Sequence, residues 1–248
     1  MHRFYLPPAE CQTGSLTLTG REAHHATRVL RLRRGDEVTV LDGAGAELSC
    51  VVQASERDVV HLTVRKKNLV PAPAHQITLL QAIPKGKIIE AIIQKAVELG
   101  VHHIVPLLTG RVTTRLDGDD AAHTAEKLQH VAIEAIKQCG SAWLPKIETP
   151  MTPGEFLARG EKFDLPLIAS LQPGARPARE YFRHFQNEHG RKPTSVCIWV
   201  GPEGDFTAEE VRAAQAAGAL PITLGRLVLR VETAATYCLS ILNHELQP

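Results

Sequence analysis

The chain has 248 residues, with 28 Lys plus Arg against 27 Asp plus Glu, so its formal net charge is +1. Apolar residues make up 44% and charged residues 22%, a composition that predicts one or two folded domains and excludes a disordered chain. No apolar run approaches the roughly 18 residues of a membrane span and no signal peptide is recognisable, so we expect no membrane contact.

Short segments of β-forming residues dominate the first part of the chain, at 15–19, 37–42, 47–53 and 58–67. Asp42-Gly43 is a hairpin signal between the second and third of these segments, and one helical run is expected near 22–31. The stretch 68–75 contains two prolines and no periodicity, which predicts a linker. We therefore expect residues 1–72 to form a small β-barrel-like domain.

The positive charge is concentrated in this N-terminal part. Residues 21–34 hold five arginines, two histidines and one acid, a net charge of +4 with neutral histidines. Such a cluster is typical of contacts with nucleic acid phosphates, although a solvated helix face is an alternative.

Strand and helix patterns alternate after residue 72. Strands are expected at 76–81, 103–108, 145–148, 165–171, 195–200 and 220–224, and helices at 86–99, 120–138, 175–187, from 207 onward and over 232–245. This alternation predicts an α/β domain over 73–248, with a mostly parallel sheet covered on both faces.

Five cysteines are scattered along the chain and form no CxxC pair. This pattern argues against a disulfide framework and a thiolate zinc site, so we expect no metal. It favours a reducing cytoplasm as the location.

Three loops follow expected strands, where ligands bind in open α/β sheets. They follow the strand at 167–171, span 201-GPEGDFT-207, and run along 224-LGRLVLRVETAA-235. The middle loop contains two glycines that allow close backbone approach, and Thr207 with Glu210 forms a capping-box signature for the next helix. Neither a dinucleotide fingerprint nor a P-loop is present, which disfavours a nucleotide-binding oxidoreductase.

The third loop brings Arg230, Glu232 and Thr233 to the expected start of the last helix, a position that favours anionic ligands. A partly buried Arg230–Glu232 pair is the structural alternative.

Five stretches together resemble the SPOUT methyltransferases, and most closely the 16S ribosomal RNA uridine-N3 methyltransferases (the RsmE family). They are 1-MHRFYLP-7, 95-KAVELGVHHIVPL-107, 134-EAIKQCG-140, 200-VGPEGDFTAEEV-211 and 224-LGRLVLRVETA-234. They occur in the family's order and span nearly the whole chain.

This resemblance implies a PUA-like RNA-binding β-barrel over 1–72 and a SPOUT methyltransferase domain over 73–248 with a C-terminal trefoil knot. It implies a homodimer that binds S-adenosylmethionine and methylates 16S rRNA of the 30S ribosomal subunit. The residues expected at the cofactor are Ser170, Leu171, Val200, Gly201, Gly204, Leu224, Gly225, Leu229 and Thr233. Those expected at the RNA are Arg3, Arg21, His25, Arg28, Arg31, Arg33, Arg34, Lys85 and Lys87.

The implied chemistry requires removal of the proton on uridine N3, which is paired in duplex RNA, so a flipped or unpaired base is expected. Arg230 is the candidate for stabilising the developing anion, and Glu203 or Glu232 for accepting the proton. A SPOUT enzyme acting on another RNA and a non-catalytic RNA-binding protein of the same fold remain alternatives.

The chain departs from the family pattern at three places. Asp205 stands where a second glycine is usual, Gly110-Arg111-Val112 replaces Glu-Arg-Ser, and Ser141-Ala142 stands where an arginine is frequent. The first departure concerns the shape of the cofactor loop, and the other two concern RNA or dimer contacts.

Overall fold

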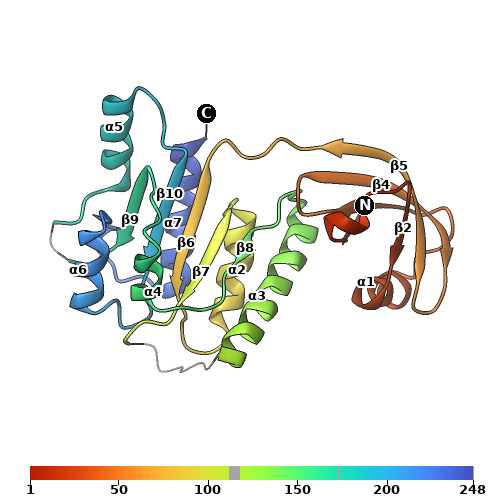
Figure 1. Cartoon of the computed structure of the whole chain (residues 1–248), viewed down its shortest axis with the longest axis horizontal. Helices are drawn as coiled ribbons and strands as arrows, with labels where there is room; N and C mark the ends of the chain where they lie inside the picture. Colours follow the sequence, from red (N-terminus) through yellow and green to blue (C-terminus); the bar gives the residue numbers. More distant parts are fainter. Residues whose placement is uncertain (112–117, 173, 248) are drawn as a thin grey trace. The chain divides into compact units, whose positions relative to one another are not determined.

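The computed structural model describes residues 1–111, 118–172 and 174–247. They form two compact units: Met1–Ala72 with Ile133–Leu144, and Pro73–Ala132 with Pro145–Pro248 (Figure 1). The division after residue 72 falls where we expected a domain boundary, whereas the segment 133–144, expected in the C-terminal domain, packs within the N-terminal unit. Among the described residues, no helix is long and apolar enough to cross a membrane.

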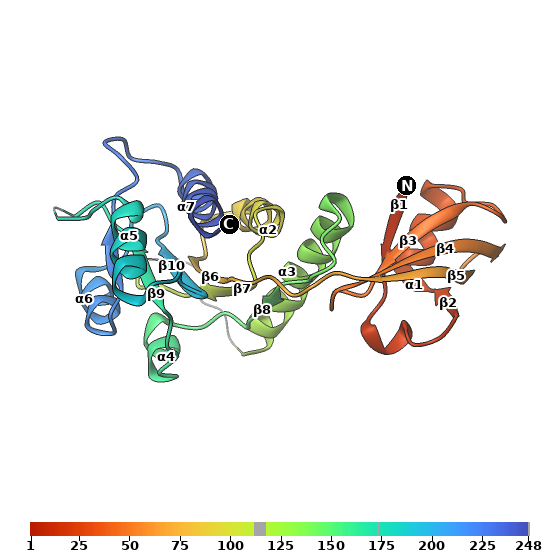
Figure 2. The same cartoon turned by 90° about the horizontal axis from the view of Figure 1, so that it is seen from above.

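The N-terminal unit is built on a five-stranded sheet in the order β1-β3-β4-β5-β2, curled as Figure 2 shows. Its edge strands are β1 and β2, and β1 pairs with β3 in parallel. Apolar side chains from all five strands form one core that includes Phe4, Leu18 and Leu48. The strands are β1 (His2–Tyr5), β2 (Ser15–Leu18), β3 (Glu37–Leu41), β4 (Ala46–Ser55) and β5 (Val60–Leu69), with a 3-10 turn at Pro8–Glu10.

The expected hairpin joins β3 to β4. The Asp42 carboxylate accepts the backbone N–H groups of Ala44 and Ala46, each at 2.8 Å, and closes the turn. Gly45 has a φ of +100°, and a Cβ there would lie 2.6 Å from the Trp143 ring, so this position requires glycine. The turn and its packing on residue 143 therefore depend on each other.

The expected helix near 22–31 is shorter and less regular. An α-helical segment, α1 (Gly20–His24), continues as a π-helical turn over His25–Val29, and the chain leaves it at Arg31 with a φ of +54°. The linker expected at 68–75 is also shorter, because antiparallel pairing with β4 extends β5 to Leu69. The irregular segment therefore begins at residue 70.

The C-terminal unit has a six-stranded sheet in the order β11-β9-β10-β6-β7-β8, in which every pair is parallel, as expected. The strands are β6 (Gln76–Ala82), β7 (His103–Leu107), β8 (Lys146–Ile147), β9 (Leu165–Ala169), β10 (Ser195–Val200) and β11 (Leu220–Ile222). The helices that lie wholly in this unit are α2 (Ile88–Glu98), α4 (Pro153–Ala158), α5 (Ala178–His189), α6 (Ala208–Ala216) and α7 (Val231–Leu246). The helix α3 (Gly118–Cys139) begins in this unit, and its residues from 133 onward belong to the N-terminal unit.

Helices cover both faces of this sheet, which confirms the expected layering (Figures 1 and 2). On one face α2 packs against α7, and on the other α4 packs against α6. Trp199 on β10 is 3% exposed and meets the ring of Phe156 on α4 edge-on at 5.5 Å. The sequence analysis did not predict α4, which is a short helix. Its sequence signal is the capping box of Thr152 and Glu155 at its N-terminus.

A buried cation joins the end of α3 to the rest of the N-terminal unit. The Lys137 side chain is 6% exposed, and its Nζ lies 2.7 Å from the Glu22 carboxylate and 2.8 Å from that of Glu134. Burial lowers the pKa of Lys137, but the hydrogen bonds to Glu134 and Glu22 outweigh burial, so the pKa is raised. Arg3 donates from Nη1 to the carbonyl oxygens of Lys137 and Gln138 and so binds the last turn of the helix.

We predict that Lys137→Ala lowers the free energy of unfolding by about 3 kcal/mol, because Glu22 would keep a largely buried charge without its cation. The matched control is Lys146→Ala, which removes an ion pair with Glu148 whose lysine is 71% exposed. That change should cost less than about 1 kcal/mol. Urea denaturation measures both variants, and equal losses would show that burial of the Lys137 network is unimportant.

Candidate functional site

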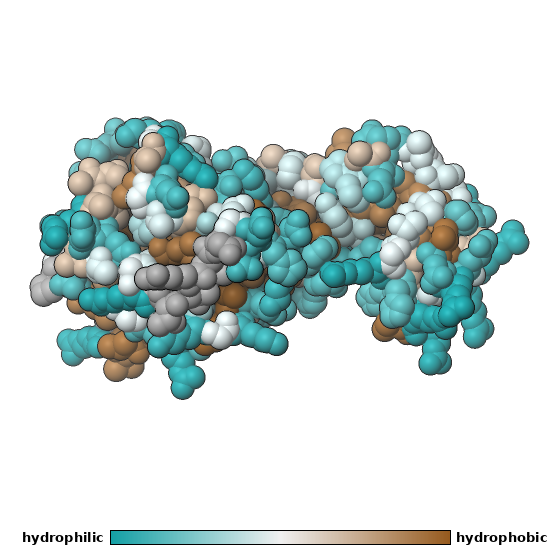
Figure 3. Space-filling view, turned by 60° about the horizontal axis from the view of Figure 1, so that its bottom comes forward, coloured by the Kyte–Doolittle hydropathy of each residue, from teal (hydrophilic) through white to brown (hydrophobic). Residues whose placement is uncertain are grey.

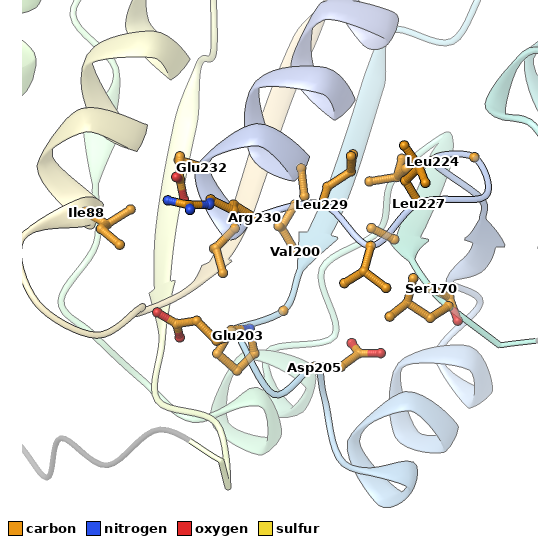
Figure 4. A pocket seen from close by; sticks show the side chains of 18 residues that line it. Ile88, Ser170, Val200, Glu203, Asp205, Leu224, Leu227, Leu229, Arg230 and Glu232 are labelled. Atoms are coloured by element: carbon orange, nitrogen blue, oxygen red, sulfur yellow. The ribbon is translucent and has the colours of Figure 1, made fainter.

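A cavity of about 450 Å³ opens at the carboxyl end of β9, β10 and β11. Because β9 lies between β10 and β11, the loops that follow these three parallel strands meet at one edge of the sheet. Residues of all three loops therefore line one cavity. Figure 4 shows the side chains that point into the cavity.

Most of the residues expected at a cofactor line this cavity. Gly204 and Thr233 are not among the lining residues, and Thr233 is exposed in the first turn of α7. The three expected catalytic residues all line it. The complete set of predicted residues found in the lining is Ser170, Leu171, Val200, Gly201, Glu203, Leu224, Gly225, Leu229, Arg230 and Glu232.

The loop between β10 and α6 forms a tight turn in the wall of the cavity. Asp205 donates its N–H to the Pro202 carbonyl at 2.9 Å and has a φ of +60°. This left-handed conformation suits glycine, and Asp is among the few other residues that adopt it. The expected capping box follows, with Glu210 N–H donating to Thr207 Oγ1 at 3.2 Å.

Gly110 and Arg111, which follow β7, form hydrogen bonds with the segment between β10 and α6 and with the start of α6. The sequence did not predict these contacts. Gly110 donates its N–H to Glu210 Oε1 at 2.8 Å, and the Arg111 guanidinium donates to the Gly204 carbonyl. The departures at 110 and 111 were expected to concern RNA or dimer contacts, yet both residues support the cavity loop. Val112 lies outside the described residues.

The third departure from the family pattern is also structural. Ser141 Oγ accepts the Trp143 N–H at 3.2 Å, and the Ala142 carbonyl accepts the Gly45 N–H at 2.9 Å. This pair belongs to the N-terminal unit and supports its β3–β4 turn. The geometry therefore assigns these two residues to packing.

Arg230, Glu232 and Glu203 lie together at one side of the cavity, near Ile88 (Figure 4). Arg230 is the N-cap residue of α7, and Glu232 lies in the first turn, where the helix dipole favours a carboxylate. The alternative of an Arg230–Glu232 ion pair is not realised among the described residues. The Glu203 carboxylate accepts the Lys85 N–H at 3.0 Å and ties its loop to the start of α2.

The rim of the cavity is apolar and open to solvent. Leu227 is 77% exposed and Val228 is 79% exposed, and both line the cavity. Exposed large apolar side chains around a concave site indicate a surface that a ligand or another macromolecule covers.

The residues expected at the RNA divide into two groups. The arginines 21, 28, 31, 33 and 34 are exposed, and hydrophilic side chains dominate the face of the N-terminal unit seen in Figure 3. In contrast, Arg3 binds the end of α3, and the His25 ring packs 6.0 Å from that of Phe4. Lys85 and Lys87 belong to the C-terminal unit, where both are exposed between β6 and α2, beside Glu203.

Comparison with known proteins gives matches that together span nearly the whole chain. The sequence matches the RNA methyltransferase domain family over residues 71–243 and the RNA methyltransferase PUA domain family over residues 18–65. It is 33% identical to the ribosomal RNA small subunit methyltransferase E of Synechocystis sp., over 98% of this chain and 77% of that protein. It is 28% identical to the protein of the same name from Bacillus subtilis, over 99% and 97% of the two chains.

Two solved structures are also similar over nearly their whole length. A Legionella pneumophila protein described as a methyltransferase with bound SAM has a TM-score of 0.88 and 32% identity, and covers 98% of this chain and 96% of its own. The ribosomal RNA small subunit methyltransferase E from Neisseria gonorrhoeae, bound to S-adenosylmethionine, has a TM-score of 0.84 and 27% identity, with 98% and 97% covered.

The two capping boxes of the C-terminal unit allow a matched test of the support from Gly110. Glu155 serves the Thr152 cap alone, whereas Glu210 serves the Thr207 cap and also accepts the Gly110 N–H. We predict that Glu210→Ala lowers the free energy of unfolding by about 1.5 kcal/mol more than Glu155→Ala, the scale of a hydrogen bond to a charged group. Chemical denaturation of both variants measures the difference, and equal losses would contradict the role of Gly110.

Proposed function

The chain belongs to the RNA methyltransferase family, among relatives named ribosomal RNA small subunit methyltransferase E, and we propose that it methylates N3 of a uridine in 16S rRNA with S-adenosylmethionine. The observation that carries this proposal is the cavity formed by the three loops after β9, β10 and β11. The α/β fold, the N-terminal PUA-like unit and the relatives crystallised with this cofactor all support it.

The cavity fits the proposed cofactor in size and chemistry. A volume of about 450 Å³ lies within the range of ligand sites, and its walls combine leucine and valine side chains with glycine backbone. Leu224, Gly225 and Leu229 offer backbone groups for an adenine edge, and Gly201 leaves room for the ribose. When bound, S-adenosylmethionine supplies an electrophilic methyl group on a sulfonium centre.

The polar side of the cavity supplies the groups for the methyl acceptor. We assign Arg230 to stabilise the negative charge that develops on the uracil oxygens as N3 loses its proton. Of the two candidate bases, Glu203 already accepts the Lys85 N–H, which fixes a neighbouring loop. We therefore assign Glu232 as the proton acceptor and Glu203 as a residue that positions the entrance near Lys85 and Lys87.

The exposed arginines of 21–34 are assigned to the RNA backbone. Their segment contains one acid, Glu22, and the carboxylate of that acid is bound by Lys137, so it does not neutralise the arginines on the surface. Phosphate contacts of this kind position a substrate and carry little sequence information. His25, which packs beside Phe4, is better placed to hold the segment than to stack on a base.

The remaining features of the family belong to this proposal as well. We propose a homodimer with a C-terminal trefoil knot, acting in the cytoplasm where the ribosomal subunits are. The exposed side chains of Tyr237 on α7 and of the rim residues Leu227 and Val228 support a contact with a second copy. Light scattering tests the dimer, since a mass equal to the 27.1 kDa chain would contradict it.

Methyl transfer to defined RNA substrates tests the function itself. Purified protein and labelled S-adenosylmethionine are incubated with 30S subunits lacking the modification, with naked 16S rRNA and with transfer RNA, and the product nucleoside is identified by mass spectrometry. The proposal expects N3-methyluridine in the 30S sample. Modification of transfer RNA alone would identify a different RNA substrate, and cofactor binding without any transfer would identify a non-catalytic RNA-binding protein.

We predict that Arg230→Ala lowers kcat by about 100-fold or more and that Glu232→Gln lowers it by a similar factor, with cofactor affinity measured separately by calorimetry. Glu209→Gln, an exposed position in the first turn of α6 outside the cavity lining, is the control. Near-wild-type rates of both variants at saturating cofactor would refute these assignments.

A second prediction concerns the salt dependence of RNA binding. Because each phosphate contact releases counterions, Arg28→Ala and Arg33→Ala should each reduce the slope of log affinity against log salt by about 1. Arg183→Ala, an exposed arginine on α5, should leave the slope unchanged. Slopes that are the same for all three variants and the wild type would place the RNA elsewhere.

A further inference from the structure

The second carboxylate of the middle loop, that of Asp205, is not used by the proposed reaction. Asp205 lines the cavity and has a φ of +60°. This is the left-handed region, which glycine adopts without a steric cost. Its side chain is only partly exposed. Its carboxylate therefore belongs to the wall of the space that a ligand would occupy.

The carboxylate is fixed in place by its own loop. One oxygen, Oδ1, accepts the Phe206 N–H at 2.7 Å, and a Cβ at Gly201 would lie 3.0 Å from the same oxygen. The side chain therefore packs over the glycine that lines the cavity. Among the described residues, the structure gives the other oxygen, Oδ2, no hydrogen-bond donor and Asp205 no ion pair.

Asp205 lies on the side of the cavity away from the catalytic groups. Figure 4 shows its carboxylate on the side of Ser170, Leu224 and Leu227, whereas Glu203 points toward Arg230 and Ile88. Ser170 is 8% exposed and its hydroxyl oxygen already accepts the Gln172 N–H at 3.1 Å. The cavity thus has one polar side for the methyl acceptor and a second polar position beside the loop assigned to the adenine.

We propose that Asp205 Oδ2 accepts a hydrogen bond from a ribose hydroxyl of the bound adenosyl group; this inference rests on the proposed function. A ribose diol offers two neutral donors, and dinucleotide-binding α/β folds use an acid to bind a ribose 2′-hydroxyl. The position also separates the carboxylate from the methyl-transferring side, where a cationic sulfonium belongs. Asp205 is therefore a specificity-determining residue for the sugar.

Calorimetry with a ligand panel tests the proposal. The panel comprises S-adenosylmethionine, S-adenosylhomocysteine and the 2′-deoxy and 3′-deoxy forms of S-adenosylhomocysteine. Asp205→Gly removes the carboxylate without backbone strain, and Asp205→Asn keeps the shape and one acceptor oxygen while removing the charge. Asp58→Asn, on the β4–β5 turn of the N-terminal unit, is the control for loss of an acid, and thermal unfolding verifies that each variant folds.

For the wild type, at least one deoxy ligand should bind about tenfold more weakly than its parent, the scale of a hydrogen bond to a charged group. Asp205→Gly should lose about tenfold in affinity for S-adenosylmethionine and S-adenosylhomocysteine alike, and should no longer discriminate against that deoxy form. Asp205→Asn should also lose affinity, because its single amide oxygen is held by the Phe206 N–H and an NH2 group, which cannot accept, stands in the place of Oδ2. Asp58→Asn should bind as the wild type does.

Three results would overturn the inference. Unchanged affinities in Asp205→Gly would show that the carboxylate has no ligand contact. A loss of affinity for S-adenosylmethionine alone would assign the carboxylate to the sulfonium. An equal loss of affinity for all four ligands, with the preference for the parent over the deoxy form unchanged, would assign it to the amino acid part of the ligand. If the wild type binds none of the four ligands, the proposed function fails instead, so the two failures are distinguishable.

Discussion

The position of β9 between β10 and β11 is the constraint on which the site depends. Parallel pairing of these strands sets their carboxyl ends side by side, so that loops separated along the chain surround one cavity. In such a sheet both faces are covered by helices, and the carboxyl edge is where backbone and loop side chains remain open to a ligand. The polar groups of the cavity are therefore loop residues, whereas the strands beneath supply mainly apolar packing, such as that of Trp199 against Phe156.

Hydrogen bonds between neighbouring loops give the cavity its shape. Glu210 binds Gly110, Arg111 binds the Gly204 carbonyl, and Glu203 binds the Lys85 N–H, so the middle loop is held from two directions. A loop that is fixed before a ligand arrives loses less conformational entropy on binding, which favours affinity. The same arrangement divides the carboxylates by role, since an acid that holds a loop is a weaker candidate for proton transfer than one that is free of such contacts.

The N-terminal unit shows a similar division among its charged residues. Lys137 and Glu22 form a largely buried pair, and Arg3 binds the end of α3, so these charges stabilise the unit. The arginines at 21, 28, 31, 33 and 34 stay exposed, which leaves a cationic surface on a chain whose net charge is only +1. A local cationic surface on a nearly neutral chain suits a protein that binds one shaped RNA site and has weak affinity for bulk nucleic acid.

Local signals in the sequence were enough to predict the strand at 37–42 and the capping box of Thr207 and Glu210. They were also enough to predict the parallel α/β class and the three loops that line the cavity. Each of these features depends on residues that are close together in the chain. The sequence alone did not predict that Arg3 binds the end of α3 or that Arg111 supports Gly204. Those partners are 134 and 93 residues apart, and no local pattern encodes such a contact. Only the packing of strands and helices decides which distant residues meet. The tertiary structure thus showed that Arg3 contacts the end of α3. It also showed that Asp205, which the sequence marked only as a departure from a family pattern, lines the cavity.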